Sequence, residues 1–134
     1  MKVSVDFDDT LEHPSVQRYI KRLILRGHDV WIVTSRADGK IGYGCSVSGK
    51  NDDLFAIADH LQIPRNKIHF TNGSFKADFF KDNMDFVLHL EDDEREIQKI
   101  REHTTVATVN PKKSYWIRKC EEVIQSKETT KEQR

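Results

Sequence analysis

Residues 3 to 11 read VSVDFDDTL, a short apolar run that ends in three closely spaced aspartates, Asp6, Asp8 and Asp9. The β-branched residues of the run predict a strand over residues 2 to 6. Two carboxylates about 4 Å apart repel each other by roughly 4 kcal/mol at an effective dielectric near 20. Three of them at the end of a buried strand therefore need a counter-charge, and the stretch predicts a functional site as well as a strand.

Strand and helix patterns alternate along the rest of the chain. Short, mainly apolar runs predict strands over residues 2 to 6, 28 to 34, 67 to 71, 85 to 90 and 104 to 110. Apolar residues at helical spacing predict helices that begin near Pro14, at Asn51, at Ser74, at Asp92 or Asp93, and at Asn110 with Pro111. This alternation is typical of a doubly wound, three-layer α/β/α Rossmann-like domain with a mainly parallel, five-stranded sheet.

Length and composition fit one domain without a strong overall charge. The 134 residues suffice for a single core, which we expect to span residues 1 to 126, followed by a charged, disordered tail over residues 127 to 134. Lysine and arginine together number 22, as do aspartate and glutamate, so no global field attracts nucleic acid or an anionic membrane. Cys45 and Cys120 form no paired motif, and no signal peptide or membrane span is expected, which predicts a cytoplasmic protein.

Polar residues follow four of the predicted strands, at positions that share one edge of a parallel sheet. They are Asp6, Asp8, Asp9 and Thr10 after the first strand, Thr34, Ser35 and Arg36 at the end of the second, Lys76 beyond the third, and Glu91, Asp92 and Asp93 after the fourth. Ligands of doubly wound sheets gather at this edge, so we expect these side chains to meet. One lysine cannot offset so many acids, whereas a hard divalent cation can, and oxygen ligands suit Mg²⁺ better than zinc.

Four motifs in this order resemble those of the haloacid dehalogenase (HAD)-like phosphohydrolase superfamily. They are Asp6-x-Asp8-x-Thr10-Leu11 after an apolar strand, Thr34 at the end of the next strand, a downstream lysine, and an acidic pair after a later strand. The resemblance covers about residues 2 to 110. A lone DxDxT would be weak support, because acidic clusters are common, but four ordered motifs on strand ends are specific.

The resemblance implies a role for each motif residue. Asp6 would be the nucleophile that attacks phosphorus and forms an aspartyl-phosphate, and Asp8 the general acid and base. The Thr34 hydroxyl would donate to a phosphoryl oxygen, while Lys76 would pair with the phosphoryl group and with Asp6. Thr10, Ser35 and Arg36 are the further residues expected to bind substrate, although an exposed arginine at the start of a loop is the simpler interpretation of Arg36.

The resemblance leaves the metal ligands and the lysine partly open. The ligands implied for Mg²⁺ are Asp6, the backbone carbonyl of Asp8, Asp92 and, as a further carboxylate, Asp93 or Glu96. Glu91 departs from the family, which often has a small residue there, so the choice between Asp92 and Asp93 stays open. Lys76 is preferred over Lys81 and Lys50 because it falls in the first turn of its predicted helix.

Taken together, the motifs imply an enzyme: a Mg²⁺-dependent phosphatase that hydrolyses a phosphate monoester. Its substrate would be a phosphorylated small molecule or macromolecule, with no membrane partner and with nucleic acid only as a substrate. The short spacing between motifs leaves only residues 36 to 50 as a flap. The chain therefore is similar to minimal, capless family members, whose site stays open.

Three other interpretations remain. A phosphoryl-accepting receiver or a metal-binding regulatory module also collects acids, a threonine and a lysine at strand ends, but receivers usually lack an acid at the position of Asp8. The run Gly44 to Asn51 nearly spells a P-loop, yet no apolar strand directly precedes it and Asn51 replaces the expected hydroxyl. A basic patch could form from Lys112, Lys113, Arg118 and Lys119, but acids at 121 and 122 dilute it.

Overall fold

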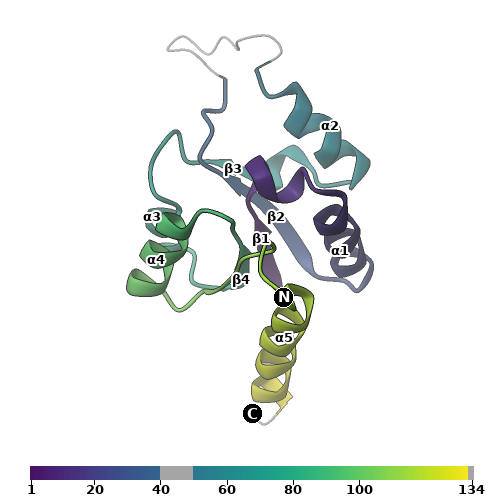
Figure 1. Cartoon of the computed structure of the whole chain (residues 1–134), viewed down its shortest axis with the longest axis vertical. Coiled ribbons are helices and arrows are strands. Elements are labelled where there is room, and N and C mark those ends of the chain that lie inside the picture. The colour runs from purple at the N-terminus through teal and green to yellow at the C-terminus, as the bar shows by residue number, and fades with distance from the viewer. Residues whose placement is uncertain (40–49, 133–134) are drawn as a thin grey trace.

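The computed structural model describes residues 1 to 39 and 50 to 132 of the chain. Five parallel strands form one sheet in the order β3-β2-β1-β4-β5 (Figure 1). The strands are β1 (Lys2–Val5), β2 (Asp29–Thr34), β3 (Ile68–Phe70), β4 (Phe86–Leu90) and β5 (Ala107–Val109). The predicted fold class is confirmed, and the sheet is parallel throughout.

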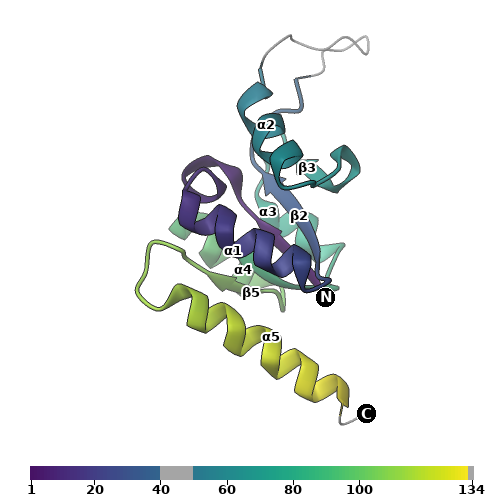
Figure 2. The same ribbon diagram turned by 90° about the vertical axis from the view of Figure 1, so that its right-hand side faces the viewer.

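Helices cover both faces of the sheet. They are α1 (Pro14–Leu25), α2 (Asp52–His60), α3 (Lys76–Lys81), α4 (Glu94–His103) and α5 (Trp116–Glu132), with short helical turns η1 (Phe7–Leu11) and η2 (Arg65–Lys67) between elements. Buried side chains of α1, α2 and α5 pack into one core, and those of α3 and α4 pack into another. Figures 1 and 2 show α3 and α4 across the sheet from α1, which gives the three layers.

The two central strands present different side chains to the two cores. Val3 and Val5 of β1 belong to the larger core beside α1 and α5, as do Leu88 and Leu90 of β4. Successive side chains of a strand point to opposite faces. Ser4, which pairs with His89 in the register of β1 and β4, therefore faces α3 and α4.

The N-terminus of α3 differs from the prediction. Ser74 is not its N-cap: the helix begins at Lys76 and ends at Lys81, and Phe75 occupies the cap position. The backbone N–H of Lys76 instead donates to a carboxylate oxygen of Glu96 in α4, at 3.0 Å. An acid from a neighbouring helix thus does what a local cap residue was expected to do.

The other helix starts follow the predictions in part. Asp93 caps α4, where its carboxylate accepts from the backbone N–H of Arg95 at 2.9 Å, as predicted. Asn51 occupies the cap position of α2, but its side chain donates to the carbonyl of Ala37 at 3.0 Å and makes no cap bond.

The C-terminal helix begins later and ends later than predicted. It starts at Trp116 and not at Asn110, because the side chain of Asn110 accepts from the backbone N–H of Lys112 at 2.9 Å and forms a turn instead. It continues through Glu132, although residues 127 to 134 were predicted to be disordered. Residues 127 to 132 contain no glycine or proline and several good helix formers, which accounts for the helix there.

Some predictions fall on residues that the structure does not describe. Residues 40 to 49 hold most of the predicted flap, Cys45 and most of the run that resembles a P-loop, and they lie outside the described residues. Residues 133 and 134 at the end of the chain do so as well. Among the described helices, none has the length and apolar character needed to cross a bilayer.

Candidate active site

The topology leaves a crevice at the carboxyl ends of β1 and β4. These strands are neighbours, but the chain leaves β1 toward α1 on one face and leaves β4 toward α4 on the other. Such a switch point is where doubly wound sheets bind ligands. Val5 pairs with Leu90, and the backbone N–H of Asp6 donates to the carbonyl of Leu90 at 2.9 Å, so Asp6 lies beside Glu91.

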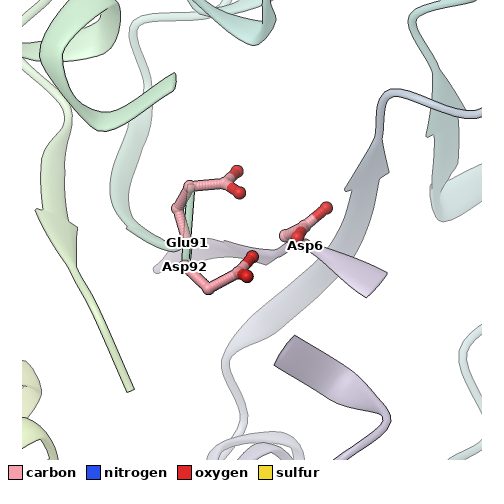
Figure 3. A group of neighbouring side chains, drawn as sticks. All are labelled: Asp6, Glu91 and Asp92. Carbon is pink, nitrogen blue, oxygen red and sulfur yellow. The ribbon is translucent and has the colours of Figure 1, made fainter. Parts of the chain in front are cut away.

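Three carboxylates meet at this crevice. Asp6, Glu91 and Asp92 each offer an oxygen atom, and these atoms lie within 4.8 Å of one another. Figure 3 shows Asp6, from the end of β1, facing the two neighbouring acids at the end of β4. Asp6 and Glu91 are buried and Asp92 is half-buried, so the group is no ordinary surface cluster.

The turn after β1 is held by short-range hydrogen bonds. The carbonyl of Asp6 accepts from the backbone N–H of Leu11 at 3.1 Å, and the N–H of Asp9 donates to the Glu12 carboxylate at 2.8 Å. Asp9 adopts a left-handed conformation with φ of 57°, which aspartate tolerates better than most residues do. This local geometry fixes the backbone on which Asp6 and Asp8 stand.

Lys76 is buried between two of the acids. Its Nζ lies 2.7 Å from Oδ1 of Asp6 and 2.5 Å from Oε1 of Glu91, and its side chain is 2% exposed. Lys81 lies elsewhere, with its Nζ 3.5 Å from Asp78 on the surface, and Lys50 is exposed. Of the three candidate lysines, the structure brings only Lys76 to the site.

One ammonium group between two buried carboxylates leaves a negative charge in excess. Burial, followed by the neighbouring Glu91 carboxylate, raises the pKa of Asp6 to about 8, although Lys76 opposes the rise. Burial also raises the pKa of Glu91. For Lys76 burial acts in the opposite direction, but Asp6 and Glu91 outweigh it and raise its pKa. The cluster therefore retains a proton near neutral pH unless a cation takes the proton's place.

Thr10 lies inside the acidic cluster. Its buried hydroxyl is 3.3 Å from Oδ2 of Asp6 and 3.0 Å from Oδ1 of Asp92, so it can donate to either carboxylate. Burial acts against ionisation of Asp92, but hydrogen bonds from Asp6, Thr10 and Lys112 hold its pKa below the usual value. Lys112 belongs to the predicted basic patch, and its Nζ lies 3.4 Å from Asp92. The structure thus places Thr10 between two carboxylates.

Arg36 fixes the carboxylate of Asp8. Its Nε and Nη2 bind both oxygens of Asp8 at 2.7 to 3.2 Å. Its Nη1 and Nη2 bind Asp53 in α2 at 2.7 and 2.9 Å, and Nη1 also reaches Asn51 at 3.5 Å. The guanidinium stacks over the Phe7 ring at 4.8 Å. All five donors of Arg36 are engaged within the protein, so a substrate anion would have to displace one of these partners.

Of the two hydroxyl residues predicted for the site at the end of β2, Thr34 and Ser35, only Ser35 lines the cavity. Thr34 is fully buried, and its hydroxyl accepts from the backbone N–H of Arg36 at 3.2 Å. Ser35 lines the cavity at the site, whereas Thr34 does not. Neighbouring residues of an extended segment face opposite ways, so a shift of one position exchanges which hydroxyl reaches the cavity.

A cavity of about 210 Å³ opens above the cluster. Its lining residues are Asp6, Asp8, Asp9, Ser35, Lys76, Glu91, Asp92, Asp93 and Glu96. At roughly 30 Å³ for each water-sized group, it has room for several such groups. Asp93 and Glu96 line it, but their carboxylates bind the N-termini of α4 and α3, which leaves Asp92 as the available acid of the fourth motif.

A larger hollow lies away from these residues. It measures about 580 Å³ and is lined mainly by aromatic and polar side chains of β3 and α3, among them His69, Phe70, Phe75 and Phe79. It contains none of the residues predicted for the site. The chemistry therefore belongs to the smaller, acidic cavity, where titratable groups with shifted pKa values converge.

Glu91 is the residue whose part the sequence did not reveal. The sequence placed it at this edge of the sheet and marked it as a departure from the family pattern, but gave it no partner. In the structure its Oε1 accepts a hydrogen bond from Nζ of Lys76 and lies 2.8 Å from Nε2 of His89. Its Oε2 accepts from the backbone N–H of Asp93 at 3.3 Å. The strand alternation was the available signal, because it places residues 89 and 91 on the face away from Leu88 and Leu90.

No protein-family model matches this chain, and no curated protein sequence matches it. The arrangement of its own residues therefore carries the functional argument.

Proposed function

We propose that the chain is a Mg²⁺-dependent phosphatase of the HAD-like type, which hydrolyses a phosphate monoester through an aspartyl-phosphate on Asp6. The observation that carries the proposal is the convergence of Asp6, Lys76 and Asp92, from three separate segments, on one cavity at the switch point of the sheet. The proposed nucleophile Asp6, its cationic partner Lys76 and the further acid Asp92 thus lie where doubly wound sheets bind ligands.

Asp6 is the proposed nucleophile. One of its carboxylate oxygens would attack phosphorus while the bond to the ester oxygen breaks, and water would later hydrolyse the aspartyl-phosphate. Lys76, held 2.7 Å from Asp6, would stabilise the negative charge on the transferring group. The cavity walls supply Ser35 as a further hydrogen-bond donor.

The acids of the cluster fit a hard divalent cation. The available side-chain ligands are carboxylate oxygens, and the cluster carries more negative charge than Lys76 can offset. Asp6 and Asp92, with the backbone carbonyl of Asp8, are the groups that would hold Mg²⁺. The fully buried Glu91 carboxylate accepts from Lys76, His89 and a backbone N–H, whereas Asp92 is half-buried and its charged partner, Lys112, is an exposed lysine that a cation can displace. When bound, the cation would neutralise excess charge and favour the ionised form of Asp6.

Asp8 is the proposed general acid and base, and Arg36 holds it. The carboxylate lines the cavity, but both of its oxygens accept from Arg36. Oδ1 accepts two of these bonds and Oδ2 accepts one, so Oδ2 is the oxygen that keeps a lone pair for proton transfer. The second candidate is a phosphoryl-accepting regulatory module without efficient turnover. The bonds between Arg36 and Asp8 favour it, because an Asp8 that does not act as a base would leave the phosphoaspartate on Asp6 unhydrolysed.

Turnover of a generic aryl phosphate tests the proposal. Wild-type protein should release phosphate with Mg²⁺ and not with a chelator, and Asp6→Asn should abolish release. Asp78→Asn, an exposed acid of α3 outside the cavity, is the matched control and should behave like wild type. Robust turnover without any divalent cation would contradict the proposed mechanism.

Asp8→Asn separates the two candidates. In a phosphatase it should lower turnover strongly or trap the phosphoaspartate, because the water that completes the reaction loses its base. In a regulatory module, hydrolysis would be slow in the wild type and in the variant alike. Mass spectrometry of acid-quenched protein, with an 80 Da phosphoryl adduct as the readout, distinguishes these outcomes.

A further inference from the structure

A chain of buried hydrogen bonds leads from the middle of the sheet to the proposed nucleophile. Oγ of Ser4 lies 2.7 Å from Nδ1 of His89, and Nε2 of His89 lies 2.8 Å from Oε1 of Glu91. The same oxygen of Glu91 accepts from Lys76, which in turn binds Asp6. Each of these five residues is at most 4% exposed.

The chemistry of the groups fixes the direction of each bond. Oε1 of Glu91 accepts from Lys76 and Oε2 accepts from the backbone N–H of Asp93, so Glu91 is the acceptor in this network and Nε2 of His89 is the donor. Complete burial and the neighbouring Lys76 lower the pKa of His89 to about 3, so the ring is neutral and its Nδ1 is an acceptor. Ser4 must then donate to Nδ1, and this bond selects the tautomer that supports Glu91.

The rest of this face shows that the fold does not require polar groups here. The adjoining core consists of apolar side chains from α3, α4 and the strands, and Phe80 packs with its ring centroid 5.0 Å from that of His89. Burying a hydroxyl and an imidazole is costly unless both are hydrogen-bonded. Apolar residues at positions 4 and 89 would fill the same space without that requirement.

These hydrogen bonds fix the position of the Lys76 ammonium group. A lysine side chain is flexible and loses rotamer freedom when it is fixed in one position. Asp6 alone would hold the ammonium from one side only. Glu91 holds it from the other, and Glu91 is itself fixed by His89 and by the backbone N–H of Asp93.

We infer that Glu91, His89 and Ser4 are positioning residues that hold the Lys76 ammonium against Asp6 in the geometry needed for phosphoryl transfer. The inference rests on the proposed function, because the step that Lys76 would serve is the attack by Asp6. It goes beyond that function in assigning a role to Ser4 of β1 and His89 of β4, two buried residues that do not line the cavity.

Two substitutions of His89 test the inference. The amide nitrogen of His89→Gln can take the place of Nε2 and keep the donor to Glu91, whereas His89→Leu fills the space without a donor. Loss of an outer support of this kind typically costs 10- to 100-fold in activity, so His89→Leu should lower kcat by about that factor with KM within about threefold. His89→Gln should keep kcat within about fivefold of wild type, since it retains one hydrogen bond.

Ser4→Ala provides a milder test in case His89→Leu does not fold. It removes one hydroxyl, and the loss of one hydrogen bond corresponds to a decrease in kcat of about 2- to 10-fold. Phe80→Leu is the matched control, because it disturbs the packing against His89 without touching the hydrogen bonds. It should lower the midpoint of thermal unfolding while kcat stays within about twofold.

The resonance of the Lys76 ammonium group gives a readout that does not depend on activity. In ¹⁵N-labelled protein its protons should exchange slowly and give a signal, which is assigned by its absence in Lys76→Met. The signal should persist in His89→Gln and broaden or vanish in His89→Leu. If wild type shows the signal but releases no phosphate, the proposed function is wrong. The role of Ser4, His89 and Glu91 in fixing the Lys76 ammonium is then still supported. If kcat and the signal are the same in His89→Leu as in wild type, or if both His89 variants lose activity equally, the inference is overturned.

Discussion

The two faces of the central strands carry opposite kinds of side chain. On the face toward α1 and α5, residues such as Val5 and Leu90 are fully buried in a large apolar core. On the face toward α3 and α4, the same strands carry Ser4 and His89, and the chain continues directly into Asp6 and Glu91. Apolar packing stabilises the face toward α1 and α5, whereas hydrogen bonds and ion pairs hold the face toward α3 and α4.

The difference shows how one short sheet can serve stability and chemistry together. The apolar face gains free energy from every buried group, in any arrangement that fills the space. The polar face contributes to stability only if every buried polar or charged group has its hydrogen-bond or ion-pair partner, because an unpaired buried charge is strongly destabilising. Substitutions on the first face should therefore change stability alone, and those on the second should change both stability and the behaviour of the site.

The largest effect should come from the lysine of the polar face. Lys76→Met leaves the carboxylates of Asp6 and Glu91 buried without their counter-charge, which should lower the free energy of unfolding by about 3 to 5 kcal/mol. Urea unfolding at about pH 10, well above the pKa of about 8 that Asp6 has in the native protein, is the measurement, because proton uptake by the acids offsets less of the loss there. Lys81→Met is the control from the same helix: its pair with Asp78 is exposed and should contribute less than about 1 kcal/mol. Equal losses in the two variants would remove the distinction between the faces.

A substitution on the apolar face should have a slightly smaller and purely structural effect. Leu88 is fully buried in the larger core, next in sequence to His89. Leu88→Ala should lower the free energy of unfolding by about 2 to 5 kcal/mol through lost burial and the cavity left behind. Mg²⁺ affinity, measured by calorimetric titration of the folded variant, should stay within about twofold of wild type. A large loss of Mg²⁺ affinity would show that the two faces are not independent.

The sequence predicted the apolar face better than the polar one. Strand positions, their parallel direction and the edge where Asp6 and Asp92 meet all follow from local patterns, since β-branched runs and helical spacing report on neighbouring residues. The helix start at Asp92 or Asp93 was predicted for the same reason, and the structure selects Asp93 as the cap. Such features depend on short stretches of chain and leave a visible periodicity.

The contacts that build the polar face depend on side chains far apart in the sequence. Glu96 replaces Ser74 at the start of α3 because α3 and α4 pack together, which no local motif indicates. Arg36 looked like an exposed loop residue or a substrate ligand, yet Asp8 and Asp53 use nearly all of its donors. Both Thr34 and Ser35 were predicted for the site. To tell which of the two lines the cavity, the register of the strand end had to be known to within one residue, and sequence patterns rarely fix that.

The last prediction concerns pH, and only the polar face should respond to it. Without a divalent cation, Asp6 has a pKa of about 8 in the native protein, against an ordinary value of 3.8. The native state therefore binds a proton that the unfolded chain releases, so stability is greatest below about pH 4 for this group and is lost as the pH rises toward 8. Between pH 6 and pH 8 the free energy of unfolding should fall by an amount on the order of 1 to 2 kcal/mol. Urea unfolding in the presence of a chelator measures it.

Two comparisons assign that slope to the cluster. Saturating Mg²⁺ should flatten it, because a cation held by Asp6 and Asp92 takes the place of the proton, and for the same reason Mg²⁺ affinity should rise with pH and level off above about 8. Asp6→Asn should flatten the slope without any metal, since the residue at that position no longer titrates, whereas Leu88→Ala should shift the whole curve downward and leave its slope unchanged. A slope that survives in Asp6→Asn would mean that the excess charge resides elsewhere, and the contrast between the two faces would then need a different physical cause.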